Sequence, residues 1–153
     1  AMLLRSGAVI EPLPIADRRL IYIGKADGHT QRDHLLYRSS SQSAPRRTLG
    51  ALLKWHLGLI AFPRGRALTQ RDVDHFNFGD GEPRLTAWMR EHLLIARAPV
   101  AAPARAIEKA LIFKLQPTIN LTDWQNPHIS TIRELKRACR DEAAARRDDR
   151  LSP

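Results

Sequence analysis

The stretch that decides the fold is short and apolar: residues 20–25 read Leu20-Ile21-Tyr22-Ile23-Gly24-Lys25. An apolar run of this length that ends on a glycine is typical of a β-strand. Residues 7–10 form a similar run, and the prolines and charged residues between the two runs predict a turn. We therefore predict that 7–10 and 20–24 pair as antiparallel strands, followed by a loop.

The rest of the chain alternates helical patterns with one further apolar run. Residues 93–96 are continuously apolar and are predicted to form a central strand, whereas 63–81 shows no clear period. The predicted fold is α+β, with a small, mainly antiparallel three-stranded sheet flanked by helices. Capping patterns and the spacing of apolar residues predict helices over 30–38, 45–57, 83–92, 103–116 and 130–147.

Length and composition limit the class of protein. The 153 residues predict a single domain over 2–147, followed by a flexible tail over 148–153. Cys139 is the only cysteine, so disulfide frameworks and cysteine-based zinc sites are excluded, and a reducing, cytoplasmic location is expected. The apolar stretch 93–104 is interrupted by Arg97 and two prolines, which predicts no membrane span.

The charge indicates an anionic partner. The 25 Lys and Arg residues exceed the 16 Asp and Glu residues, and the formal net charge is +9. Arg outnumbers Lys by 20 to 5, and its planar guanidinium suits bidentate contacts with phosphate. Nucleic acid is therefore the predicted partner, and a well-solvated surface without a ligand is the alternative. The sequence makes no prediction of the oligomeric state.

Side chains around residues 20–25 are candidates for phosphate chemistry. Tyr22 and Lys25 lie at one end of the predicted strand, and Arg32 lies on the first turn of the helix that follows. With the carboxylate of Glu108 they would supply the cations, proton acceptor and metal ligand that phosphodiester cleavage uses. Spacing alone favours a structural alternative, in which Tyr22 packs at a sheet edge, Lys25 is solvated and Glu108 pairs with Arg105 or Lys109.

The order of the motifs along the chain favours the interpretation as a site for phosphate chemistry over the structural alternative. Arg32 follows Tyr22 by ten residues, Glu108 lies in the helical stretch 106–112, and Asn120 lies in Gln116-Pro117-Thr118-Ile119-Asn120-Leu121. In this order the motifs resemble the GIY-YIG nuclease superfamily over most of the chain. Residues 46–53 and 84–93 also resemble segments of a bacterial subgroup of GIY-YIG domain proteins.

The resemblance implies a metal-dependent endonuclease that acts on DNA. It implies that Tyr22 and Arg32 face the scissile phosphate and that Glu108 binds one divalent ion, magnesium or alternatively manganese. It also implies that Asn120 braces the site through hydrogen bonds. Tyr37 lies near a position where many members carry a histidine or tyrosine on the same helix, which makes it a further candidate for substrate binding.

The first motif departs from the family pattern. Gly-Ile-Tyr is expected there, but the best candidate is Gly7-Ala8-Val9, which has an aliphatic side chain in place of the phenol. Tyr22 would then act alone, with its phenolate stabilised by Lys25, Arg32 and the metal. A metal-bound hydroxide is the other route. The alternative function is a catalytically impaired module of the same fold that binds nucleic acid. An interaction domain without a nucleic-acid role is the third possibility.

Basic residues outside these motifs are candidates for phosphate contacts. Arg46 and Arg47 lie at a predicted helix start, where the helix dipole disfavours cations unless an anion is bound. A solvated helix end is the alternative for this pair. On the last helix, Arg133, Arg137 and Arg140 are spaced four and three residues apart and form one basic face.

Overall fold

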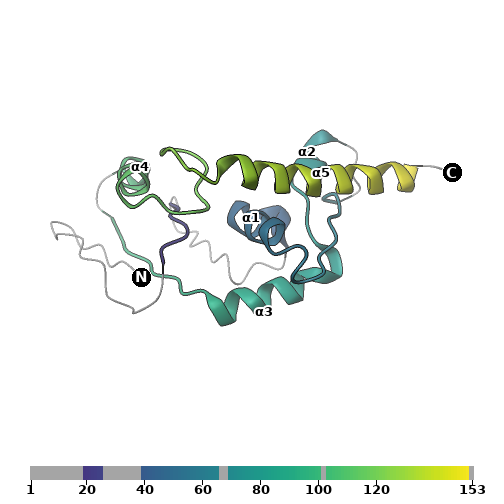
Figure 1. Cartoon of the computed structure of the whole chain (residues 1–153), viewed down its shortest axis with the longest axis horizontal. Helices are drawn as coiled ribbons and strands as arrows, with labels where there is room; N and C mark the ends of the chain where they lie inside the picture. Colours follow the sequence, from purple (N-terminus) through teal and green to yellow (C-terminus); the bar gives the residue numbers. More distant parts are fainter. Residues whose placement is uncertain (1–18, 26–38, 66–68, 101–102, 152–153) are drawn as a thin grey trace. The chain divides into compact units, whose positions relative to one another are not determined.

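The computed structural model describes residues 19–25, 39–65, 69–100 and 103–151, with side chains described as far as Arg146 in the last range. Contacts divide the chain into two compact units. The first unit combines the described part of residues 1–32 with 92–127, and the second combines the described parts of 33–91 and 128–153 (Figure 1). The single domain predicted over 2–147 stays a prediction.

The second unit is helical. It contains the short 3₁₀ helices η1 (Ser40–Gln42) and η2 (Gly79–Gly81), and the helices α1 (Ala44–Leu52), α2 (Gln70–Asp74), α3 (Glu82–His92) and α5 (Ile129–Leu151). The Ser43 hydroxyl accepts a hydrogen bond from the Arg46 N–H, and Pro45 occupies the first turn, so α1 begins with a capped N-terminus. α5 packs against α1 and α2, and α1 lies between α5 and α3 (Figure 1).

The core of the second unit depends on one close approach of backbone to ring. The rings of Phe76 and Phe78 are both buried and meet edge to face, with 5.6 Å between their centroids. A Cβ atom at Gly50 of α1 would lie 2.0 Å from a carbon of the Phe78 ring. Only glycine at this position therefore allows α1 to lie against the ring. Further buried apolar residues include Leu49, Leu85, Met89, Ile132, Cys139 and Ala143.

The first unit is built on α4 (Ala104–Leu115). The helix ends at Gln116, whose backbone is left-handed with a φ of 49°, and Pro117 follows. The turn after α4 is closed by the Asn126 amide, which donates to the carbonyls of Thr118 and Asn120 at 2.7 and 2.8 Å. Leu111, Ile112, Pro117 and Ile119 are buried in the described part of this unit.

The predicted three-stranded sheet is wrong for the part of the chain that the structure describes. Neither 19–25 nor 93–100 contains a strand, and the run 7–10 lies outside the described residues. Residues 93–96 are not a buried central strand, because Leu94 and Ile95 are 58% and 42% exposed. Within the described ranges, ladder pairing is limited to one antiparallel bridge between Phe62 and Asn77.

A side chain pairs with the backbone of segment 21–25 at Ile23. The Asn120 Oδ1 atom accepts a hydrogen bond from the Ile23 N–H, and its Nδ2 atom donates to the Ile23 carbonyl, both at 2.9 Å. The Ile119 N–H also donates to the Ile21 carbonyl at 2.9 Å. One carboxamide thus satisfies both backbone groups that a strand partner would otherwise pair.

Unlike the sheet, most of the predicted helices are present, because the apolar spacing that predicts a helix is a local feature of the sequence. Those predicted over 45–57, 83–92, 103–116 and 130–147 are present as α1, α3, α4 and α5, with shifted ends. The helix predicted over 30–38 lies outside the described residues. Across the described ranges, every helix is either too short or too polar to cross a lipid bilayer.

Candidate active site

Hydrogen bonds to three alternate residues hold segment 21–25 against α4 and the turn that follows it. Besides the contacts of Ile21 and Ile23 described above, the Lys25 N–H donates to Oε1 of Glu108 at 3.1 Å. Glu108 lies 83 residues further along the chain than Lys25. The first unit therefore brings Tyr22, Lys25, Glu108 and Asn120, which the motifs had singled out, into one region.

Gly24 determines where the phenol of Tyr22 lies. A Cβ atom at Gly24 would lie 2.7 Å from Cε1 of Tyr22 and 2.8 Å from its hydroxyl oxygen. The half-buried ring thus lies over the backbone of the glycine two residues further on, in space that any other side chain would occupy. The glycine after the tyrosine is required for the position of the phenol as well as for the end of the apolar run.

The carboxylate of Glu108 is largely buried and engages two donors. Its side chain is 12% exposed; Oε1 accepts from the Lys25 N–H, and Oε2 accepts from Nη1 of Arg105 at 2.8 Å. The other terminal nitrogen of Arg105 donates to Oδ2 of Asp123 at 3.0 Å. The hydrogen bond to Glu108, together with the charge of Asp123, raises the pKa of Arg105 above its ordinary value, so the guanidinium stays charged.

Asn120 connects segment 21–25 to the loop that carries Asp123. Its side chain pairs with Ile23, and its backbone carbonyl accepts from Nε1 of Trp124 at 3.0 Å and from the Asn126 amide at 2.8 Å. Asn120 is 7% exposed, so these bonds lie largely out of water. Its side-chain and backbone groups together hold both sides of the Glu108 region in place.

The residues around Glu108 fit a divalent ion held by a single carboxylate. Among the described residues, no three His, Cys, Asp or Glu side chains gather as a ready-made metal site. Mg²⁺ is commonly held by one or two carboxylates, with waters and substrate phosphates completing the shell. A carboxylate has about four lone-pair positions, and the two donors described above engage one position on each oxygen of Glu108.

The other predicted site residues fall elsewhere. Arg32 and Tyr37 lie outside the described residues. Arg46 lies in the second unit and is fully buried, with Nη2 donating to Oε2 of Glu82 at 2.7 Å and to the Thr86 hydroxyl at 3.0 Å. A guanidinium in this position holds α1 to α3 and has no surface to offer to a phosphate.

Arg47 belongs to a group of cations on the second unit. Its Nη1 donates to the carbonyls of Ser40 and Ser41, and burial, followed by the charge of Arg64, lowers its pKa. On α5, burial followed by the charges of Arg47 and Arg140 lowers the pKa of Lys136. We call Arg47, Lys136 and Arg140 the α1–α5 cation cluster. Within this cluster the charges of Arg47 and Arg140 disfavour the charged form of Lys136.

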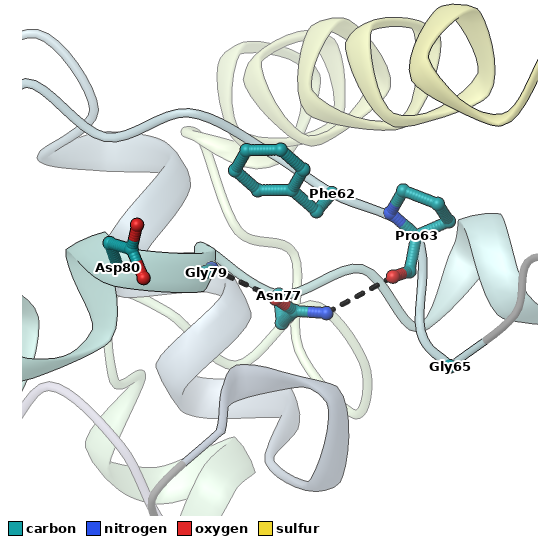
Figure 2. Close-up of a pocket in the computed structure, with 6 residues that line it drawn as sticks. All are labelled: Phe62, Pro63, Gly65, Asn77, Gly79 and Asp80. Carbon is teal, nitrogen blue, oxygen red and sulfur yellow. Dashed lines mark hydrogen bonds between the residues drawn. The ribbon is translucent and has the colours of Figure 1, made fainter. Parts of the chain in front are cut away.

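A pocket of about 330 Å³ on the second unit is poorly suited to a phosphate. Among the described residues its lining carries the carboxylate of Asp80 and no cationic side chain, and Figure 2 shows the Asn77 side chain joining the Gly79 N–H to the Pro63 carbonyl. The guanidinium of Arg146 lies 5.0 Å from the ring centroid of Phe62, which lines the pocket, but Arg146 is not itself part of the lining. The full lining is Phe62, Pro63, Gly65, Asn77, Gly79 and Asp80.

Cys139 is a structural residue. It is fully buried in α5, and burial raises the pKa of its thiol to about 11. The thiol therefore stays protonated near neutral pH and is unsuited to nucleophilic chemistry.

Three features of the site were not part of the functional prediction. The pairing of Arg105 with Glu108 follows from their i,i+3 spacing on a helix, and this part of the structural alternative is confirmed. Asp123 lies 18 residues from Arg105, and no local sequence pattern predicts the hydrogen bond between them. The overlap of Tyr22 with the Cβ position of Gly24 depends on the three-dimensional path of the chain.

Comparison with known proteins gives one match. A family model described as GIY-YIG catalytic domain matches residues 13–142. Neither the curated proteins nor the solved structures contain a significant match to the chain.

Proposed function

Because the chain belongs to the GIY-YIG catalytic domain family, a family of nuclease type, we propose that it is a metal-dependent endonuclease that hydrolyses phosphodiester bonds in DNA. The observation that carries the proposal is the hydrogen bond of the Lys25 N–H to Glu108. It brings the acid of α4 to the segment that carries Tyr22, across a long stretch of intervening chain. These are the side chains that the motifs assign to the chemistry.

In this proposal each residue has a separate task. Tyr22 accepts a proton from the attacking water, and Lys25 with Arg32 stabilises the phenolate and the negative charge of the phosphate. Glu108 holds the divalent ion, which supplies electrostatic stabilisation of the phosphate oxygens when bound. Asn120 keeps segment 21–25 aligned with the turn after α4.

The test is Glu108→Gln, which removes the charge and keeps the shape of the side chain. We expect magnesium-dependent nicking of supercoiled plasmid to fall by about 100-fold or more, because a neutral amide is a poor ligand for a hard cation. Binding to the same DNA, measured without metal, is expected to stay within about twofold. Glu134→Gln is the matched control, since that side chain is exposed on α5.

Equal nicking by Glu108→Gln and the parent would contradict the proposal. The second candidate function, a binding module of the same fold without catalysis, is favoured by Val9 in place of the first motif's phenol. It predicts DNA binding without nicking in magnesium, in manganese and in EDTA alike. Nicking of plasmid or branched DNA that occurs only with metal would exclude this candidate.

A further inference from the structure

One guanidinium bridges two largely buried carboxylates in the first unit. Arg105 donates to Glu108 at 2.8 Å and to Asp123 at 3.0 Å, each through a different terminal nitrogen. The two acid side chains are each 12% exposed, whereas the Arg105 side chain is 57% exposed. The carboxylates are therefore fixed in place, and the cation between them reaches in from the solvent side.

We propose that Arg105 occupies the cation position of Glu108 and that a divalent ion binds there only when the guanidinium leaves. This inference rests on the proposed function, since it concerns the metal site of the same reaction. Arg105 is thus a positioning residue, which sets how readily Glu108 accepts metal. The conclusion follows from charge, because an ion on Oε2 of Glu108 would lie next to the guanidinium and the two cations would repel each other.

The surroundings of Arg105 suit an exchangeable counter-ion. Its long side chain has open solvent on one side, so it can rotate away without disturbing the core. Asp123 keeps it at Glu108 in the absence of metal, and the Trp124 bond to Asn120 holds the loop that carries Asp123. If the bridge is only a surface ion pair of α4, removing it leaves metal affinity unchanged.

The experiment measures Mn²⁺ binding to the full chain by isothermal titration calorimetry, without nucleic acid. Arg105→Gln is expected to bind Mn²⁺ about 5- to 10-fold more tightly than the parent, because the competing state of Glu108 is removed. Lys114→Gln, which removes an exposed cation from the last turn of the same helix, is the control and is expected to stay within about twofold. Thermal unfolding checks that each variant is folded.

Two outcomes would overturn the inference, and they can be told apart. Equal Mn²⁺ affinity of Arg105→Gln and the parent, with binding abolished by Glu108→Gln, would refute the role of Arg105 and leave the metal site standing. Binding that Glu108→Gln does not weaken in either background would refute the metal site itself. A gain in affinity in Arg105→Gln that is lost in the double variant with Glu108→Gln is the result we expect.

Discussion

The two units each contain an arginine paired with a glutamate, and the two pairs have opposite surroundings. Arg46 and Glu82 in the second unit are 2.7 Å apart, with side chains 0% and 8% exposed. Arg105 and Glu108 in the first unit are 2.8 Å apart, but the Arg105 side chain is 57% exposed. The atoms and the distances are nearly the same, so the role of each pair depends on burial and on its other partners.

The additional partners show the same contrast. Glu82 also accepts from the backbone N–H and hydroxyl of Ser40 and from the N–H of Phe78, so it ties η1 and the start of α3 to α1. If Glu82 exchanged its partners, several buried hydrogen bonds would be lost at once. Among the described residues, Glu108 accepts from only two donors, the Lys25 N–H and the guanidinium of Arg105, whose side chain is 57% exposed. Buried pairs of this kind serve the structure, whereas exposed ones can serve function.

The largest expected effect is on stability, for Arg46→Met. The substitution leaves the Glu82 carboxylate buried without a counter-ion, and the loss of unfolding free energy is expected to be about 3–5 kcal/mol. Arg105→Met is the matched control, for which we expect a loss of about 1 kcal/mol, because the Arg105 side chain is 57% exposed and water can take its place beside the carboxylates. Urea unfolding followed by circular dichroism measures both variants.

Equal losses in the two variants would break the comparison, since burial would then not distinguish the pairs. Arg46→Lys makes the comparison more specific, because lysine keeps the positive charge and removes the branched guanidinium group. We expect this variant to lose less stability than Arg46→Met. It also provides a measurable protein if Arg46→Met does not fold.

The next largest effect compares one added methyl group in each unit. Gly50→Ala forces a methyl group into the Phe78 ring and is expected to cost about 1–3 kcal/mol of unfolding free energy. Gly24→Ala instead displaces the phenol of Tyr22, which is only half-buried, so we expect stability to change little and nicking to fall by about 100-fold. The two variants serve as controls for each other in parallel unfolding and nicking assays.

A Gly24→Ala variant that nicks DNA at the parent rate would contradict the assignment of Tyr22 as proton acceptor. Nicking lost in proportion to stability in both variants would instead show that the effect is on folding. The comparison therefore separates a catalytic position from a packing position with the same chemical change.

What the sequence predicts well here is local. Apolar spacing predicted α1, α3, α4 and α5, and the i,i+3 spacing indicated the pairing of Arg105 with Glu108. In the described residues the predicted sheet is wrong, and at Ile23 both backbone groups are instead paired by the side chain of Asn120, 97 residues away, which no local pattern predicts. Arg46 and Arg47 are sequence neighbours at the start of one helix, and sequence alone does not reveal that one is fully buried.

The smallest expected effect concerns Lys136 in the α1–α5 cation cluster, which, unlike Arg46 and Arg105, is not paired with a described carboxylate. No hydrogen bond or ion pair joins Lys136 to another described residue, and Arg140 lies one helical turn away at i,i+4, with its own contact to Asp74 at 3.7 Å. Like charges at this spacing are unfavourable, so Lys136→Met is expected to raise the unfolding free energy by about 0.5 kcal/mol.

The gain in stability should be accompanied by weaker binding to DNA. If Lys136 contacts a phosphate, removing its charge lowers by about one the magnitude of the slope of log affinity against log salt concentration. Lys114→Met, which removes an exposed cation from α4, is the control for a charge that lies outside the cluster. An unchanged slope in Lys136→Met would show that the cluster makes no phosphate contact. A lower slope in a more stable protein would show that the second unit tolerates its unpaired charge because nucleic acid neutralises it.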